Sequence, residues 1–239
     1  MCSCGGQRPQ TPKSTAVVTC PDKPWDVACI LDTFCKGDAE DREVVKKLPR
    51  LTVHRREPKE VHYKKFEGGK WVDGGFRSGG SARGTEVWVN KDTNCCDAAA
   101  TLFHEVTHTD QPESMAGSQR EYDAYFKTEQ WRIKKGLPPH NPSFRKKVKD
   151  PKDPTKEIEV PDMEAIKKKV DKTYAYNPPT PISGGAPPPS VVGLTPDGSG
   201  KVRLSDGTTR PPKEGDAYRL PDTGGNVLQT IDPGAWKCP

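Results

Sequence analysis

Residues 94–110 read NCCDAAATLFHEVTHTD, and this stretch decides how the middle of the chain folds. Asn94 is a preferred N-cap residue, and Asp97, three positions later, places an acidic side chain at the positive end of a helix. Apolar residues recur every four positions from residue 98 to residue 106, as on the buried face of an amphipathic helix. Because Pro112 cannot continue a helix, we predict a single helix over residues 94–110 with one buried face.

The same helix carries His104, Glu105 and His108 in the pattern H-E-x-x-H. Residues four apart lie one turn apart on the same face, so both imidazoles can bind one zinc ion. Glu105 is then placed to act as a general base toward a water molecule on that ion. The alternative is a solvated helix end with two incidental histidines, but five histidines in 239 residues seldom form this pattern by chance.

A catalytic zinc site needs a third protein ligand and an open position for water. The longer pattern H-E-x-x-H-x-x-G-x-x-H is absent, because Gln111 and Ser114 occupy the places of its Gly and last His. We expect Glu121 to be the third ligand. It follows His108 across a loop that can reverse the chain, and it lies on a second helix predicted over residues 118–135.

Two alternatives to Glu121 as a ligand stay open. Ser118 and Glu121 also fit an S-x-x-E capping box, in which the carboxylate binds only the amide of the N-cap residue. Asp123, two positions further on, is the fallback ligand. Two protein ligands alone would hold the metal poorly, which favours Glu121 as a ligand over Glu121 as a cap.

Other residues near the motif are candidates for supporting roles. Asp110 and Glu113 are suited to orient a histidine by accepting its second ring proton. A fourth protein ligand from Cys95, Cys96 or His140 would instead close the site and make the zinc structural. In that case the chain would be a non-catalytic binding module.

The segments on either side of the motif helix predict an α+β fold. The apolar spacing indicates helices over residues 25–35, 38–48 and 163–172. Alternating residues indicate strands over 51–55, 60–66, 70–76 and 86–90, the second and third joined by a hairpin turn at Gly68-Gly69. Shorter strand-like runs follow at 191–194, 201–204, 217–220 and 227–231.

The chain contains 25 prolines and 22 glycines, and segments rich in them separate its parts. Residues 1–24 form an irregular arm, and residues 177–190, NPPTPISGGAPPPS, form a linker. Between them we expect the main domain over 25–176, with the core between about 25 and 170. Residues 191–239 are then a small β-rich or loosely ordered tail.

Composition and charge exclude some classes of protein. The 38 basic and 33 acidic residues give a net charge of +5, concentrated in residues 132–149 and 167–172. We interpret these runs as solvated helix faces, since no stacking aromatics accompany them and nucleic-acid binding is the weaker alternative. No window is apolar over about 20 residues, so no membrane span is expected. Residues 1–19 contain no apolar signal-peptide core, so export would need other machinery.

Eight cysteines are many for so polar a chain and favour disulfides in an oxidising compartment such as a periplasm. Their spacings contain no paired Cys-x-x-Cys motifs of a structural zinc site. Eight cysteines allow 105 connectivities, and the sequence does not choose among them. The cysteines are Cys2, Cys4, Cys20, Cys29, Cys35, Cys95, Cys96 and Cys238.

H-E-x-x-H followed by Glu121-Tyr122-Asp123-Ala124 resembles the Glu-zincin metallopeptidases, in which a downstream E-x-x-A segment supplies the third zinc ligand. More narrowly, HEVTHTDQ and EYDAYFKTEQWRIKKGLP resemble metallopeptidase toxin domains of bacterial polymorphic-toxin and type VI secretion effectors. The resemblance covers about residues 51–138. This chain departs from some relatives at residue 125, where it has Tyr125 and an Asp often follows the motif. The usual outer carboxylate is therefore missing or comes from Asp123 or Asp110.

The resemblance implies a minimal zincin-like domain with a small antiparallel or mixed sheet. It implies that strand 86–90 forms the edge of this sheet beside the motif helix, where an extended peptide could add as a strand. It implies a secreted antibacterial effector, with a cell-envelope protein or the peptide stem of the cell wall as substrate in the periplasm of the target cell. A cognate immunity protein and a component of the secretion machinery are the implied partners.

Together these expectations describe a zinc-dependent hydrolase of peptide bonds. His104, His108 and Glu121 hold one Zn²⁺ ion, and Glu105 takes a proton from the attacking water. A further side chain should stabilise the oxyanion of the transition state. The candidates are Tyr122, Tyr125, His140, Tyr174 and Tyr176. A nuclease or nucleic-acid-binding effector is the least favoured alternative.

Overall fold

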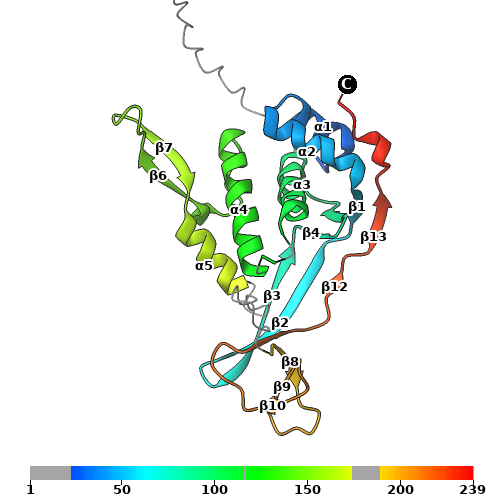
Figure 1. Ribbon diagram of the computed structural model, residues 1–239, viewed down its shortest axis with the longest axis vertical. Coiled ribbons are helices and arrows are strands. Elements are labelled where there is room, and N and C mark those ends of the chain that lie inside the picture. The colour runs from blue at the N-terminus through cyan, green and yellow to red at the C-terminus, as the bar shows by residue number, and fades with distance from the viewer. Residues whose placement is uncertain (1–22, 113, 116, 174–188, 239) are drawn as a thin grey trace, which may run out of the picture.

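The computed structural model describes residues 23–112, 114–115, 117–173 and 189–238 (Figure 1). The predicted α+β class is confirmed. The helices are α1 (Val27–Cys35), α2 (Ala39–Lys47), α3 (Cys95–Asp110), α4 (Gly117–Lys134) and α5 (Met163–Thr173), with short 3-10 turns at Leu48–Arg50, Pro142–Phe144 and Pro233–Ala235. The strands before α3 are β1 (Thr52–Arg56), β2 (Lys59–Glu67), β3 (Lys70–Ser78), β4 (Gly80–Arg83) and β5 (Glu86–Asn90).

A mixed sheet in the order β13-β1-β5-β4 forms the centre of the fold. Strand β5 runs parallel to β1 and antiparallel to β4, and β13 (Val227–Thr230) pairs antiparallel with β1. The expectation that residues 86–90 form the sheet edge is therefore wrong. The edge beside α3 is β4, a strand that the sequence analysis did not predict, because its residues Gly-Ser-Ala-Arg lack the β-branched alternation typical of strands.

Helix α3 packs its apolar face on this sheet. Ala98, Leu102 and Val106 are buried, as their spacing predicts, and Val87 and Val89 of β5 belong to the same core. Asn94 caps the helix, since its side chain accepts a hydrogen bond from the amide of Asp97 at 2.9 Å. The buried face and the cap together fix which side of α3 faces away from the sheet.

Helix α4 lies against α3 on the side away from the sheet (Figure 1). On its other side a second apolar cluster of Phe144, Ile166 and Val170 joins α4 to α5. Strands β6 (Arg145–Lys149) and β7 (Glu157–Pro161) form a hairpin next to it, so the basic run at residues 132–149 is not one helix face. The run at 167–172 is confirmed as one, because its lysines are exposed on α5.

The long hairpin of β2 and β3 reaches away from the central sheet (Figure 1). Its turn is at Gly68 and Gly69, as predicted, with φ angles of 60° and 78° that suit glycine. Two C-terminal strands, β11 (Ala217–Arg219) and β12 (Thr223–Gly224), pair with β2. A small separate sheet contains β8 (Val191–Leu194), β9 (Val202–Leu204) and β10 (Thr209–Arg210).

The core extends into the C-terminal segment, beyond the expected limit near residue 170. Ile231 and Trp236 are buried among the residues that pack on α1 and α3. A disulfide joins Cys35 to Cys238, and a second joins Cys29 to Cys95. The C-terminus thus lies beside α1 (Figure 1). Within the described ranges, no helix has the length and apolar character needed to cross a membrane.

Candidate metal centre

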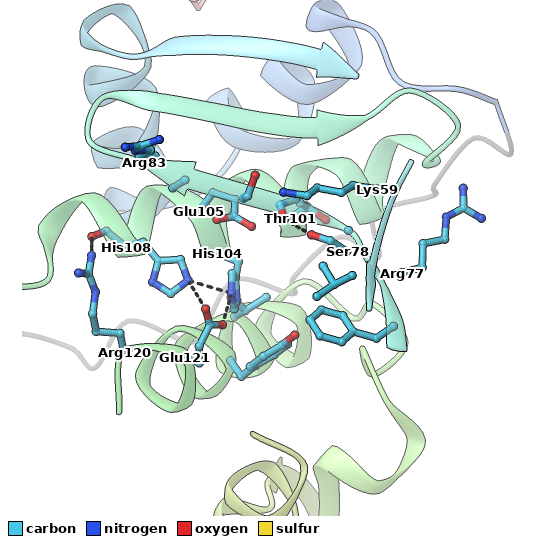
Figure 2. Close-up of a pocket in the computed structure, with 18 of the residues that line it drawn as sticks. Lys59, Arg77, Ser78, Arg83, Thr101, His104, Glu105, His108, Arg120 and Glu121 are labelled. Carbon is cyan, nitrogen blue, oxygen red and sulfur yellow. Dashed lines mark hydrogen bonds and ion pairs between the residues drawn. The ribbon is translucent and has the colours of Figure 1, made fainter. Parts of the chain in front are cut away.

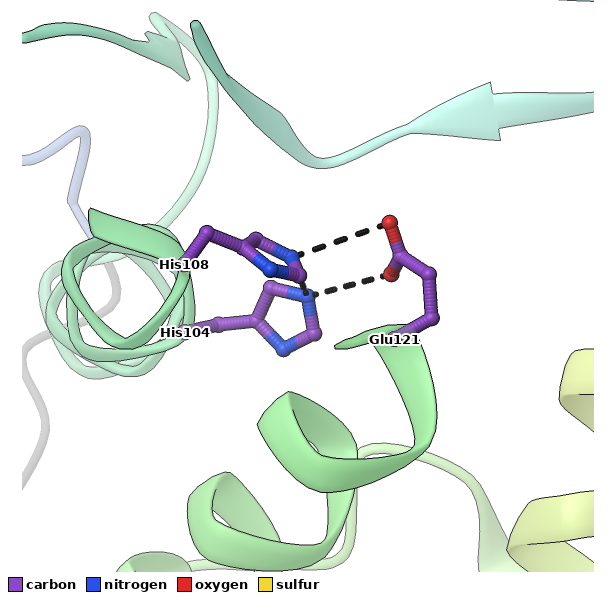
Figure 3. Close-up of side chains that lie close together, drawn as sticks. All are labelled: His104, His108 and Glu121. Carbon is purple, nitrogen blue, oxygen red and sulfur yellow. Dashed lines mark hydrogen bonds and ion pairs between the residues drawn. The ribbon is translucent and has the colours of Figure 1, made fainter. Parts of the chain in front are cut away.

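Helix α3 presents His104 and His108 side by side on the face opposite the sheet (Figure 3). Their Nε2 atoms are 3.2 Å apart, and only 11% of each side chain is exposed. Two ligands of a tetrahedral zinc ion at 2.0–2.1 Å would lie about 3.3 to 3.4 Å apart. The spacing of the two imidazoles therefore already suits a shared metal ion.

Helix α4 brings Glu121 to the same point. One carboxylate oxygen lies 3.5 Å from Nε2 of His104 and the other 3.7 Å from Nε2 of His108 (Figure 3). The carboxylate faces the imidazoles. Ser118 is the second residue of α4 rather than its N-cap, so the two residues do not form the capping box. The chain reverses between α3 and α4 as the sequence analysis expected.

These three residues fit a metal ion in both geometry and chemistry. One ligand atom from each lies within 4.8 Å of the others. Oε2 of Glu121 is buried and accepts no hydrogen bond, a costly state that a bound cation would relieve. In the part of the chain that the structure describes, no fourth His, Cys, Asp or Glu joins this group. The cluster can therefore hold a metal ion and leave positions for other ligands.

The other ring nitrogens of both histidines have partners outside the cluster. Nδ1 of His108 lies 2.8 Å from Oε1 of Gln111, and Nδ1 of His104 lies 3.4 Å from the hydroxyl of Thr128. When Nδ1 carries the proton and donates it, Nε2 keeps its lone pair for a metal. Both imidazoles are thus oriented with Nε2 toward Glu121.

Gln111 is the functional residue that could not be recognised in the sequence, because its position stands out there only as the place of a missing Gly. Its amide nitrogen donates to the carbonyl of Arg120 at 2.8 Å and to Asp123 at 2.9 Å. The side chain is buried where α3 ends and α4 begins. Gln111 therefore links the orientation of His108 to the position of α4.

The acidic residues considered for supporting roles have other contacts. Asp110 pairs with Lys47, so the expectation that it orients a histidine is wrong. Asp123 is not part of the metal cluster, but it reaches His108 through Gln111 and also binds Lys127. An amide thus stands where a carboxylate was expected. Glu113 lies outside the described residues.

The cysteine and histidine considered as a fourth ligand lie elsewhere. Cys95 is at the first turn of α3 and is bonded to Cys29. Neither Cys96 nor His140 belongs to the group around Glu121. Among the described residues, nothing supports a closed site with four protein ligands.

Glu105 is buried and lines the same cleft as the metal cluster (Figure 2). Burial raises the pKa of its carboxyl above the ordinary range, although nearby His104 and His108 oppose this shift. A Cβ atom at Gly80 of β4 would lie 2.7 Å from Oε1 of Glu105 and 2.5 Å from Thr101. Only glycine allows the edge strand to pass this close to the motif helix.

The charges of the cluster depend on one another. Burial of the His108 imidazole disfavours its charged form, but the carboxylate of Glu121 outweighs burial and raises the pKa of His108 to about 9. Burial disfavours the charged form of Glu121 too, yet the two histidines hold the pKa of Glu121 well below its usual range. Without a metal, the cluster is therefore a protonated imidazole beside a carboxylate.

A cleft of about 610 Å³ opens over the cluster. Strand β4 forms one wall, and α3 and α4 form the floor and the other wall (Figure 2). Tyr125 and His140 line it, and the ring of Tyr125 is tilted against that of His104 with the ring centroids 4.6 Å apart. Tyr122 stacks on Phe126 in the second apolar cluster instead. Tyr174 and Tyr176 lie outside the described residues.

No protein-family model matches this chain, and neither the curated proteins nor the solved structures gave a significant match.

Proposed function

We propose that this protein is a zinc-dependent peptidase of the zincin type. The observation that carries the proposal is the convergence of His104, His108 and Glu121 in one cleft with the carboxylate of Glu105 and a glycine-bearing edge strand. Two imidazoles and one carboxylate form a donor set that zinc enzymes use, with a position left for water. Zn²⁺ would supply Lewis acidity, which lowers the pKa of a bound water and polarises a carbonyl group.

The residues of the cleft would then have distinct roles in the reaction. The Nε2 atoms of both histidines and the carboxylate of Glu121 would hold the ion. Glu105 directly follows His104 and is buried in the cleft wall. Its carboxylate would take a proton from the attacking water and later deliver that proton to the leaving amine. Tyr125 and His140 are the candidate donors to the developing oxyanion, because both line the cleft.

The edge strand supports a peptide as the substrate. On its outer side β4 has no partner strand among the described residues, and this side borders the cleft. An extended peptide can add to such an edge through backbone hydrogen bonds, which hold it in register without regard to most of its side chains. The scissile bond would then lie between β4 and the metal cluster.

The wider role that we propose is a secreted antibacterial effector that acts in the periplasm of a target cell. The two disulfides support an oxidising destination. The substrate would be an envelope protein or the peptide stem of the cell wall, and the partners an immunity protein and a secretion component. Expression in cytoplasmic and periplasm-directed forms, each beside its Glu105→Gln control, tests this role. If both active forms leave the cells unharmed, the effector role is wrong.

The substitution Glu105→Gln tests the catalytic role. We expect peptidase activity to fall by about 10²- to 10⁴-fold, because the amide cannot accept the proton, while the zinc content stays unchanged. Activity is measured as new amino termini released from a broad peptide mixture, and zinc by elemental analysis. Glu164→Gln, at an exposed position on α5, is the matched control and should change neither quantity. A zinc-loaded Glu105→Gln variant with full activity would refute the assignment.

A further inference from the structure

One buried charge beside the cleft takes no part in the mechanism above. Arg56 ends β1 and is only 3% exposed, although arginine is almost never fully buried without a charged partner. Its guanidinium donates to three uncharged oxygens: Oδ1 of Asn90 at 3.3 Å, the hydroxyl of Ser81 at 2.9 Å and the hydroxyl of Ser78 at 3.2 Å. Burying a cation among neutral partners is costly, and such an arrangement is expected at a functional site rather than in a purely structural core.

The hydrogen bonds of Arg56 converge on the turn that leads from β3 into β4, here called the β3–β4 corner (residues 78–81). Ser78 of this corner lines the cleft (Figure 2). Asn90 binds the same corner. Its side-chain amide donates to the carbonyl of Ser78 at 2.7 Å, and its backbone amide donates to the carbonyl of Gly79 at 3.3 Å. Arg56 and Asn90 together therefore fasten the corner to the central sheet.

Arg56 and Glu105 lie on opposite faces of β4. Gly80 faces α3, because a Cβ atom added there would meet Glu105 and Thr101. Since successive residues of a strand point to opposite faces, Ser81 points away from α3, and there Arg56 binds it. Burial lowers the pKa of Arg56, and attraction to the carboxylate of Glu105 on the other face of the strand opposes this shift. Strand β4 is therefore held between the motif helix on one face and Arg56 on the other.

Strand β4 has little rigidity of its own. It contains four residues and pairs with β5 on one side. Gly79 and Gly80 lie where it begins, and glycine has the largest conformational freedom of all residues. A stiffer residue cannot replace Gly80, because only glycine fits beside Glu105. The strand must therefore be fixed from outside, and the hydrogen bonds of Arg56 supply this restraint.

We propose that Arg56 is a positioning residue of the peptidase, which acts through the β3–β4 corner to hold β4 where a bound peptide reaches the metal cluster. This inference rests on the proposed peptidase function and on the pairing of the peptide with β4. Arg56 itself is too deeply buried to touch a substrate. Its loss should therefore weaken peptide binding, whereas the groups that carry out the chemistry lie on α3 and α4 and stay in place.

The test compares the kinetics of full-length, zinc-loaded variants on a fluorogenic copy of one peptide that the wild type cleaves. Arg56→Lys keeps the charge, but an ammonium group lacks the fixed, planar geometry of the guanidinium. We expect its KM to rise about fivefold to 20-fold and its kcat to change less than about twofold. Arg55→Lys is the matched control on the same strand: Arg55 binds the carbonyl of Lys91 and not the corner, so its KM should stay within about twofold. A fall in kcat at unchanged KM in Arg56→Lys would indicate a merely less folded protein and overturn the inference.

Ser81→Ala removes one acceptor and leaves Arg56 in place, so it decides the test if Arg56→Lys does not fold. We expect its KM to rise about threefold to tenfold at nearly unchanged kcat, and Ser81→Thr, which retains a hydroxyl, to restore the KM. Ser81 also lines the cleft, so a direct contact with the substrate is the competing explanation. If Ser81 acts through Arg56, adding Ser81→Ala to Arg56→Lys should raise KM by less than about twofold further. Effects of the two changes that multiply would overturn the inference.

Amide hydrogen exchange separates this inference from the proposed function, because it needs no catalysis. In Arg56→Lys and Ser81→Ala, exchange should become about tenfold faster in β4 and stay unchanged in α3. Unchanged exchange of β4 in both variants would overturn the inference. Cleavage by the wild type with an unchanged KM in both variants would overturn the positioning role and leave the peptidase function standing. Faster exchange of β4 in the variants of a protein whose wild type cleaves no peptide would refute the peptidase function and leave the hold of Arg56 on β4 standing.

Discussion

The two ends of the α3–α4 pair are built in opposite ways. At one end, which we call the apolar end, Trp131 stacks on Phe103 at 5.3 Å and contacts Phe34 at 5.7 Å. At the other, the metal end, the two helices meet through His104, His108 and Glu121 beside an open cleft. On α4, Glu121 and Trp131 lie about three turns apart, whereas on α3 Phe103 directly precedes His104 and points to another side of the helix.

The difference shows where the fold obtains stability and where it gives some up. Trp131 is 1% exposed and its indole nitrogen donates to Asp41 at 2.7 Å, so the apolar end has both its packing and its polar group satisfied. The metal end keeps a buried carboxylate oxygen without a hydrogen bond. A firm apolar end can hold the metal ligands close together before any metal binds.

The largest effect is expected at the apolar end. Trp131→Ala should lower the free energy of unfolding by about 3 to 5 kcal/mol, because it removes a large, fully packed side chain. Guanidinium unfolding of the wild type and the variant measures this. Trp71→Ala, at a half-exposed position on the β2–β3 hairpin, is the control and should cost clearly less. A loss below about 1 kcal/mol in Trp131→Ala would contradict the assigned role of this end.

At the metal end, Glu121→Gln should change metal binding rather than folding. We expect zinc affinity to fall by more than about 100-fold, because a charged ligand is lost, whereas the free energy of unfolding in the presence of a chelator falls by only about 1 kcal/mol. Competition with a chromophoric chelator gives the affinity. Asp123→Asn tests the fallback ligand. If it costs as much affinity as Glu121→Gln, the assignment of the third ligand is wrong.

A smaller effect is expected for the residue that orients His108. Gln111→Ala should reduce zinc affinity by about 10- to 100-fold, the usual effect of losing a hydrogen-bond partner of a metal-binding histidine. Gln119→Ala, exposed on the first turns of α4, removes the same side chain without these contacts and should have no effect. Equal affinities of the two variants would show that Gln111 does not position the ligand.

The smallest expected effect is a pH dependence of the stability of the metal-free protein. The pKa of His108 is raised to about 9, so its contribution to stability is fully present below its ordinary pKa of 6.5 and is lost as the pH rises through about 9. With chelator present, the free energy of unfolding should fall between pH 6.5 and 9.5, on the order of 1 kcal/mol. Glu121→Gln removes the partner and should remove most of this fall. A rise over the same interval would have the wrong sign.

The metal end could be predicted from the sequence wherever the signal is local. His104 and His108 share a helix whose cap and buried face are readable in residues 94–110. Glu121 required one further assumption, that the loop reverses the chain. Gln111 was missed because its role arises only when the start of α4 places Arg120 and Asp123 against it.

Features that depend on distant residues could not be predicted. Strand β13 pairs with β1 although His54 and its partner Thr230 are far apart in the chain. No local sequence pattern predicts this pairing. The same holds for the bond between Cys35 and Cys238, one choice among the connectivities that eight cysteines allow. The β6–β7 hairpin was not predicted, because β6 has a single apolar residue, Val148, among its basic side chains.

The central claim is that the metal end is a catalytic zinc site. The most direct test is the metal content of the purified full-length protein together with the coordination of the metal, by elemental analysis and a crystal structure of the loaded protein. We predict one zinc ion bound by Nε2 of His104, Nε2 of His108 and the carboxylate of Glu121, with a water molecule completing the site. No zinc at full loading, or a site closed by four protein ligands, would contradict the account.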